Sequence, residues 1–224
     1  MLYALGDPVS LLLLLLSFLV AITVHGYVQS VVAGRSGLRQ PSAEDRATID
    51  PRRHVDPFGA VAAAIAGVGW AKPVEPPDRR RRGAMVATLL SGSIVNIGLG
   101  LVALLAFRLV GGPLPPLDGF TPLLQQGVSG DLLLRGLLLF GLSNLFVGAL
   151  SLVPLPPLDG GRLLFGLTPQ TPGWRKAEYQ LVERNIGVAV LLALLLIPLG
   201  GPQALLPTLL DIVVSPVVQL VTGG

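Results

Sequence analysis

Long apolar runs constrain this chain more than any other feature, because a membrane bundle is one of the few folds that can bury them. The longest runs extend over 8–32, 84–110 and 132–153. A helix needs roughly 20 mainly apolar residues to cross a bilayer. Of the 224 residues 51% are hydrophobic and only 13% are charged, with a mean hydropathy of +0.71. Soluble domains carry about a quarter charged residues. We therefore predict an all-α integral membrane protein.

Three further apolar stretches are shorter or less regular. Segment 185–199 is rich in leucine and predicts another crossing, whereas 58–70 is short and rich in alanine and glycine. Segment 205–221 is interrupted by two prolines and an aspartate, so that it either lies in the membrane interface or caps the bundle. We predict one domain, 1–224, that forms a compact bundle of about five to six multi-pass membrane segments.

Positive charge is distributed unevenly among the loops. Three loops hold four or five Lys and Arg residues each, whereas the ends that flank the 111–129 loop hold only Arg108 and Arg135. Cytoplasmic loops of membrane proteins are enriched in Lys and Arg. On this basis, and with a prokaryotic plasma membrane as the expected location, three loops are predicted to be cytoplasmic: 34–57, 72–83 and 162–184.

This orientation has two consequences. Segment 58–70 lies between two basic loops, so it is predicted to enter and leave the membrane on the same face as a re-entrant segment. The four consecutive arginines at 79–82 are interpreted as a topology anchor, with contact to anionic lipid as the alternative. Because topology explains the net charge of +3, nucleic acid is not an expected partner.

His25 is the first candidate site residue. It lies seventeen residues after Pro8, roughly 26 Å along the first predicted helix at 1.5 Å per residue, near its cytoplasmic end. Gln29 follows four residues later and shares the same helix face. In an H-E-x-x-H motif two histidines at this spacing bind zinc, and the glutamate between them acts as the general base. Here Gly26 replaces that glutamate, and Gln29 replaces the second histidine.

A second candidate element follows the 132–153 run. From Ser151 the sequence is S-L-V-P-L-P-P-L-D-G-G-R, in which prolines end the helix and Asp159 is presented at the break. The two glycines that follow allow another backbone segment to approach closely. An aspartate at membrane depth is costly unless it is paired or bound to something. The simpler interpretation is that Asp159 caps the next helix.

Together these elements resemble the site-2 protease family of intramembrane zinc metalloproteases, over most of the chain from about 9 to 165. P-L-P-P-L-D-G-G-R at 154–162 is similar to the family's N-x-x-P-x-P-x-L-D-G-G-R element. D-P-R-R-H-V-D-P-F-G at 50–59 is similar to N-P-x-x-H-x-D-P-x-G. The runs G-W-A-K-P-V at 69–74 and S-G-S-I-V-N at 91–96 resemble two further family stretches, the second an A-G-P-x-x-N turn.

The resemblance assigns roles to residues of this chain. It implies that the counterparts of His25, Gln29 and Asp159 bind zinc and that the counterpart of Gly26 is the general base. It also implies a β-hairpin within part of 36–57. The remaining matched residues are expected to line the cleft or support it: His54, Asn96, Ser151, Pro154, Pro156, Gly160 and Gly161. The asparagine that opens the family's proline-aspartate element is Ser151 here.

The supporting side chains also have simple structural explanations. His54 is expected to be a loop residue held by Asp50 or Asp56. Asn96 and Asn144 are expected to form hydrogen bonds between helices.

The departures from the family motif decide the function hypothesis. A general base is worth about a hundred- to ten-thousand-fold in rate, and glycine cannot accept a proton. A glutamine carbonyl is a poor zinc ligand, so His25 and Asp159 remain as good donors, one fewer than a catalytic zinc site uses. We predict a catalytically inactive member without a cofactor, which binds transmembrane segments of other proteins. The alternative is an active zinc peptidase that cleaves transmembrane helices with an unrecognised base.

Overall fold

The computed structural model describes residues 1–37, 46–74, 79–112, 130–198 and 204–222. In these ranges the chain forms helices and no strand, which confirms the predicted all-α class. The elements are, in chain order, η1 (Leu2–Gly6), α1 (Pro8–Arg35), η2 (Pro51–Arg53), α3 (Pro57–Ala66), α4 (Arg82–Leu109), α6 (Leu132–Ser151), α7 (Asp159–Leu167), α8 (Pro172–Glu178), the π-helical turn η3 (Tyr179–Glu183), α9 (Ile186–Leu196) and α10 (Leu205–Thr222).

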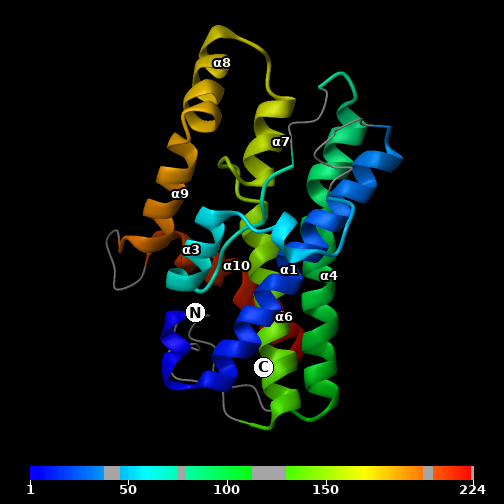
Figure 1. Ribbon diagram of the computed structural model, residues 1–224, viewed down its shortest axis with the longest axis vertical. Helices are drawn as coiled ribbons and strands as arrows, with labels where there is room; N and C mark the ends of the chain where they lie inside the picture. The colour runs from blue at the N-terminus through cyan, green and yellow to red at the C-terminus, as the bar shows by residue number, and fades with distance from the viewer. Residues whose placement is uncertain (38–45, 75–78, 113–129, 199–203, 223–224) are drawn as a thin grey trace.

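Three long helices, α1, α4 and α6, pack side by side and form the centre of the molecule (Figure 1). Their facing sides are dry, and the fully buried side chains there include Leu14, Ile22, Leu104, Leu139 and Leu142. Their outer sides are also apolar, with Leu16, Ile94 and Val102 between 51% and 67% exposed. A helix that is hydrophobic on all sides requires an apolar solvent. The bundle is therefore built to sit in lipid.

Within the described ranges, four helices are long and apolar enough to cross a membrane: α1, α4, α6 and α10. A fifth crossing results if the bent pair Pro172–Glu183 and Ile186–Leu196 is one span. The first helix begins at Pro8, where the Asp7 side chain accepts a hydrogen bond from the Ser10 amide and the proline occupies the first turn. Asp7 also pairs with Arg135 of α6, which joins the two helices at this end.

The two C-terminal apolar segments differ from their prediction, in which 185–199 crosses the membrane and 205–221 does not form a regular span. The segment predicted at 205–221 forms α10, a continuous helix of 18 residues that ends at Thr222, whereas the leucine-rich α9 has only 11 residues and is bent by 67° from the helix before it. Asn185, at φ 54°, makes that break. Pro207 does not interrupt α10, because it lies in the first turn, where the missing amide has no intrahelical partner. Pro216 lies inside the helix, and membrane helices tolerate such prolines.

The predicted re-entrant segment contains the short helix α3, which ends at Gly67 with φ 84°. Its outward side chains Phe58, Val61 and Ile65 are 40–52% exposed, as expected for contact with lipid. The predicted hairpin is not found in the described part of 36–57, and residues 38–45 lie outside the described ranges. Val55 instead forms an isolated antiparallel bridge with Ala71, beyond α3.

Candidate functional site

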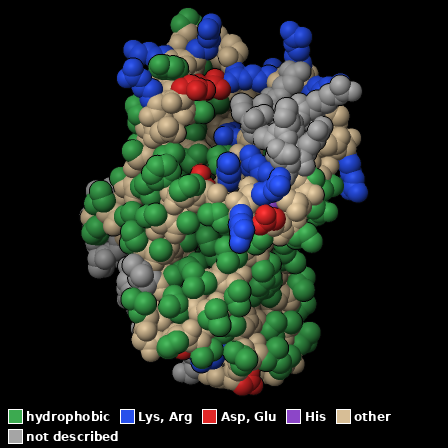
Figure 2. All heavy atoms as spheres, in the orientation of Figure 1, with side chains coloured by type: hydrophobic (Ala, Val, Ile, Leu, Met, Phe, Trp, Pro, Cys, Tyr) green, Lys and Arg blue, Asp and Glu red, His purple; other side chains and the backbone are tan. Residues whose placement is uncertain are grey.

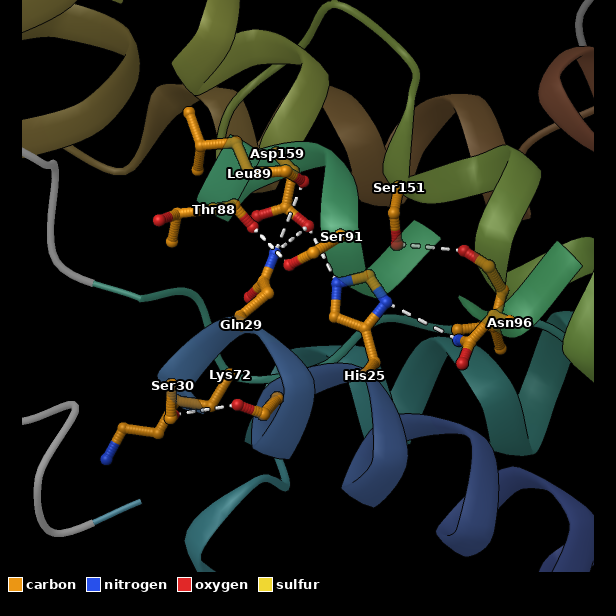
Figure 3. A network of polar contacts seen from close by, with 12 residues as sticks. His25, Gln29, Ser30, Lys72, Thr88, Leu89, Ser91, Asn96, Ser151 and Asp159 are labelled. Atoms are coloured by element: carbon orange, nitrogen blue, oxygen red, sulfur yellow. Dashed lines mark hydrogen bonds and ion pairs between the residues drawn. The ribbon is translucent and has the colours of Figure 1, made fainter. Parts of the chain in front are cut away.

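The candidate site lies where α1, α4 and α7 meet (Figure 3). His25 and Gln29 project from successive turns of α1 toward Asp159, the first residue of α7. The His25 Nε2 to Asp159 Oδ2 distance is 2.7 Å, and the Gln29 Nε2 atom lies 2.8 Å from the same oxygen. All three side chains are buried. The fold thus brings together residues that are more than 130 positions apart in the sequence.

The two glycines after Asp159 set its position. A Cβ atom on Gly160 would lie within 3.0 Å of the Leu152 carbonyl, and one on Gly161 within 3.0 Å of the Pro156 nitrogen. Only glycine therefore allows α7 to pack against the proline-containing turn that follows α6. The interpretation of Asp159 as a helix cap is wrong, because Leu158 is the N-cap residue and the Asp159 carboxylate accepts hydrogen bonds from α1.

The contacts of the His25 ring match one of its two neutral tautomers. The Asn96 amide nitrogen lies 3.4 Å from His25 Nδ1, and an amide nitrogen can only donate, so Nδ1 carries the lone pair. In a neutral ring the proton then sits on Nε2 and is donated to the Asp159 carboxylate. In this tautomer His25 Nε2 is the donor and the Asp159 carboxylate is the acceptor. Asn96 joins α4 to α1, as the sequence predicts.

The Gln29 amide group has one orientation that satisfies its neighbours. Its nitrogen donates to Asp159 Oδ2 and, at 3.3 Å, to the Leu89 carbonyl. Turning the amide over would place its oxygen against two acceptors, which is unfavourable. The Gln29 carbonyl consequently faces away from Asp159. Leu89 is a site residue that the sequence does not reveal, because it contributes only its backbone.

Gly26 is covered by the ring of His54. A Cβ atom on Gly26 would lie within 3.0 Å of His54 Nδ1, closer than real Cβ atoms approach a neighbour. His54 is fully buried, and its Nε2 lies 2.8 Å from the Thr48 carbonyl, to which it donates. Burial lowers the pKa of His54, so its ring is neutral at pH 7. Its Nδ1 lone pair therefore lies against Gly26, with no hydrogen-bond partner among the described residues.

The expected partners of His54 are wrong. Asp50 accepts from the Arg52 amide and begins η2, and Asp56 accepts from the Gly59 amide and begins α3. Both carboxylates are thus used as helix caps, which leaves the Thr48 carbonyl for the His54 ring.

Two other polar residues of α6 also bond locally. The Asn144 amide donates to the Phe140 carbonyl of its own helix, which differs from the interhelical bond predicted for it. Ser151 likewise donates to the Val147 carbonyl within α6. It lines the small cavity beside Asp159 but does not hydrogen-bond to the three site residues.

This cavity has a volume of about 10 Å³, which is room for about one water molecule. One wall is the proline-containing turn with Pro157 and Leu158, and the other is the extended segment Trp70–Pro73. That segment is held by the Lys72 amide, which donates to the His54 carbonyl at 2.7 Å, and by Arg46, which donates to the Lys72 and Pro73 carbonyls. Trp70–Pro73 belongs to the G-W-A-K-P-V run, whose role as a wall of the site the sequence alone does not specify.

Fold and site together define a polytopic membrane protein in which a helix histidine near one membrane face meets an aspartate at a proline-glycine helix break. Comparison with known proteins identifies the family. The chain is 32% identical over 200 residues to the "Putative zinc metalloprotease YwhC" of Bacillus subtilis, covering 87% of this chain and 85% of that protein. It is 32% identical over 105 residues to the "Zinc metalloprotease RasP" of Oceanobacillus iheyensis, covering 46% of this chain and 24% of that protein.

The chain therefore belongs to the site-2 protease-like family of membrane zinc metalloproteases. No protein-family model matches it, and no solved structure matches it.

The donor atoms at the site do not fit a catalytic zinc ion of the kind that the family name implies. Zinc in such sites takes three protein ligands, drawn from imidazole, thiolate and carboxylate. The described residues contain no group of three His, Cys, Asp or Glu side chains that could hold a metal. His25 Nε2 and the Gln29 amide nitrogen both contact Asp159 Oδ2. The carboxylate is thus already bonded to two donors of its own protein.

Proposed function

We propose that this protein is a non-hydrolytic member of its family that binds membrane-embedded segments of partner proteins at the cavity beside Asp159, here called the cleft. One observation carries the proposal. The position of the general base is Gly26, and the buried His54 ring fills the space into which a longer side chain would extend. Among the described residues that line the cavity, Asp159 is the only acidic one, and its Oδ2 oxygen contacts both His25 and Gln29.

Partner binding is supported by the construction of the cleft walls. Trp70–Pro73 is extended backbone at the edge of the site, and Lys72 at its centre is exposed. The cavity holds about one water, so a bound polypeptide segment must displace Trp70–Pro73 from the turn at Pro157 and Leu158. We place the basic loops 34–57, 72–83 and 162–184 on the cytoplasmic side of a bacterial plasma membrane, by the positive-inside rule.

An active zinc peptidase is the second candidate, and one observation favours it. Relatives of the chain carry zinc metalloprotease names, and two of the family's zinc-ligand positions, His25 and Asp159, are in direct contact. For this function a third metal-binding side chain must join His25 and Asp159, and a base other than position 26 must act.

A photocrosslinker tests partner binding in living cells. With p-benzoylphenylalanine in place of Lys72, at the cleft, we expect covalent adducts with membrane proteins of intact length. Lys176, which is exposed on α8 and does not line the cleft, is the matched control position and should give no such adducts. Adducts of equal yield and identity from both positions, or adducts that carry only truncated partners, would contradict the proposal.

A further inference from the structure

A second cavity lies at the end of the molecule that carries α7 and α8, and it shares no lining residue with the cavity beside Asp159, although Arg162 lies one turn of α7 beyond Asp159 and feels its charge. Its volume is about 60 Å³, enough for a group larger than one water molecule. It is enclosed by side chains from the start of α4, from α7 and from the α8–η3 helix. The site around His25, Gln29 and Asp159 does not use this cavity. The lining includes Arg79, Met85, Arg162, Phe165, Glu178 and Glu183.

Three guanidinium N–H donor atoms at this cavity are buried without an acceptor among the described residues, although two carboxylates, Glu178 and Glu183, also line it. Glu178 pairs with Arg79 through Nη2, but Arg79 Nη1 stays buried without a partner among the described residues. The Arg162 Nε and Nη1 atoms are likewise buried and unpartnered within the described ranges. Glu183 is exposed to solvent and forms no ion pair with either arginine in this part of the chain. Buried N–H groups that lack an acceptor cost free energy. An anion in the cavity would supply those acceptors.

The neighbouring helix terminus independently favours an anion. Helix α4 begins at Arg82 with no side-chain cap and no acidic residue in its first turn. A helix N-terminus carries a partial positive charge, and here the arginine run 79–82 adds to that charge. Figure 2 shows basic side chains gathered at this end of the molecule. An oxyanion close to the α4 terminus would relieve this accumulation of positive charge.

The surroundings place the cavity at the boundary between lipid and water. Leu164 and Leu167 of α7 are 37% and 45% exposed beside it. Phe165, which lines the cavity, contacts Trp174 edge to face with ring centroids 5.8 Å apart, and Trp174 is itself 38% exposed. Tryptophan is enriched at membrane interfaces, at the depth of the lipid headgroups.

We propose that this cavity binds a phosphate group, which Arg162 holds as the principal ligand and Arg79 supports. Guanidinium is planar and presents paired N–H donors that match phosphate oxygens. The exposed leucines and Trp174 favour the headgroup of an anionic phospholipid over a free phosphate as its source.

The test uses the full chain purified in uncharged detergent micelles. Its unfolding temperature is measured against increasing phosphatidylglycerol, against phosphatidylcholine as the matched lipid without net charge, and against inorganic phosphate. We expect the unfolding temperature to rise with phosphatidylglycerol content until it saturates. In Arg162→Gln the lipid content that gives half of this rise should be at least about tenfold higher, because the loss of hydrogen bonds to a charged group weakens binding on that order. Arg175→Gln, at an exposed position on α8 outside the cavity, should behave as the unaltered protein.

Arg162→Lys is a second variant that keeps the test informative if Arg162→Gln does not fold. Lysine keeps the charge but loses the paired donors, so intermediate binding is expected. A rise with inorganic phosphate that needs Arg162 and equals the lipid effect would support the phosphate site and identify its source as free phosphate. Unchanged half-saturation in both Arg162 variants, or equal effects of the charged and uncharged lipids, would overturn the proposal.

Discussion

Gly26→Ala should destabilise the protein by about 1–3 kcal/mol, whereas Gly98→Ala, in the middle of α4, should stabilise it by up to about 1 kcal/mol. Both glycines lie inside membrane helices. An added Cβ at Gly98 meets no atom within 4 Å, so alanine there supplies helix propensity alone. At Gly26 the Cβ would press on His54, whose ring is buried and tied to the Thr48 carbonyl.

Unfolding of the two variants in the same detergent measures this difference. A double variant, Gly26→Ala with His54→Ala, controls for its cause, because removal of the ring should abolish the penalty at position 26. Stabilisation by Gly26→Ala, equal to that by Gly98→Ala, would show that His54 does not occupy this space.

The same contact governs any attempt to restore the family motif. Gly26→Glu introduces a larger side chain than alanine, so the steric conflict with His54 is greater. It also places a carboxylate against the lone pair of His54 Nδ1. A chain carrying only Gly26→Glu and Gln29→His therefore meets the conflict at His54 before any zinc site can form.

Asp159→Ala should cost about 3–5 kcal/mol, the second large effect that we expect. The carboxylate accepts hydrogen bonds from His25 and Gln29 in a buried setting, and each bond to a charged group contributes about 1.5–3 kcal/mol. Its removal leaves two donors without an acceptor. Ser151→Ala is the control, because the Ser151 hydroxyl bonds only within its own helix and its loss should cost less than about 1 kcal/mol.

Denaturant unfolding of both variants, repeated with and without a zinc chelator, separates a protein-only network from a metal site. The Asp159→Ala penalty should be the same under both conditions, because the bonds lost join protein groups. A penalty that disappears when the chelator is present would mean that a bound metal, and not His25 and Gln29, is the partner of Asp159.

The sequence predicts the helices of the bundle and the helix break at Asp159 because both depend on local patterns, whereas the meeting of α1 with Asp159 is implied only by the resemblance to the site-2 protease family. The apolar runs determine the long helices, and Asp7 with Pro8 determines where α1 begins. The prolines and glycines of 154–162 determine where α7 begins and how closely it packs. These features act within a few residues, so they can be read along the chain.

The rest depends on contacts between distant segments. His54 meets Gly26 only after the loop at 46–57 folds over α1, and no spacing rule connects the two residues. The orientation of the Gln29 amide depends on the Leu89 carbonyl of α4, a backbone group that any residue would supply. For 205–221 the prolines suggested an interruption, but their positions in the helix made them compatible with a continuous span.

His25 and Gln29 both bond to Asp159, and position 26 provides no base. The most direct measurement incubates the purified, unaltered protein in zinc-containing detergent micelles with transmembrane-helix peptides and detects cleavage by mass spectrometry. We predict no peptide-bond hydrolysis above that of a His25→Ala, Asp159→Ala chain, and zinc well below one ion per protein. The contrary result is cleavage that the unaltered protein catalyses, that a chelator abolishes and that the double variant does not show. It would mean that the protein is an active zinc peptidase.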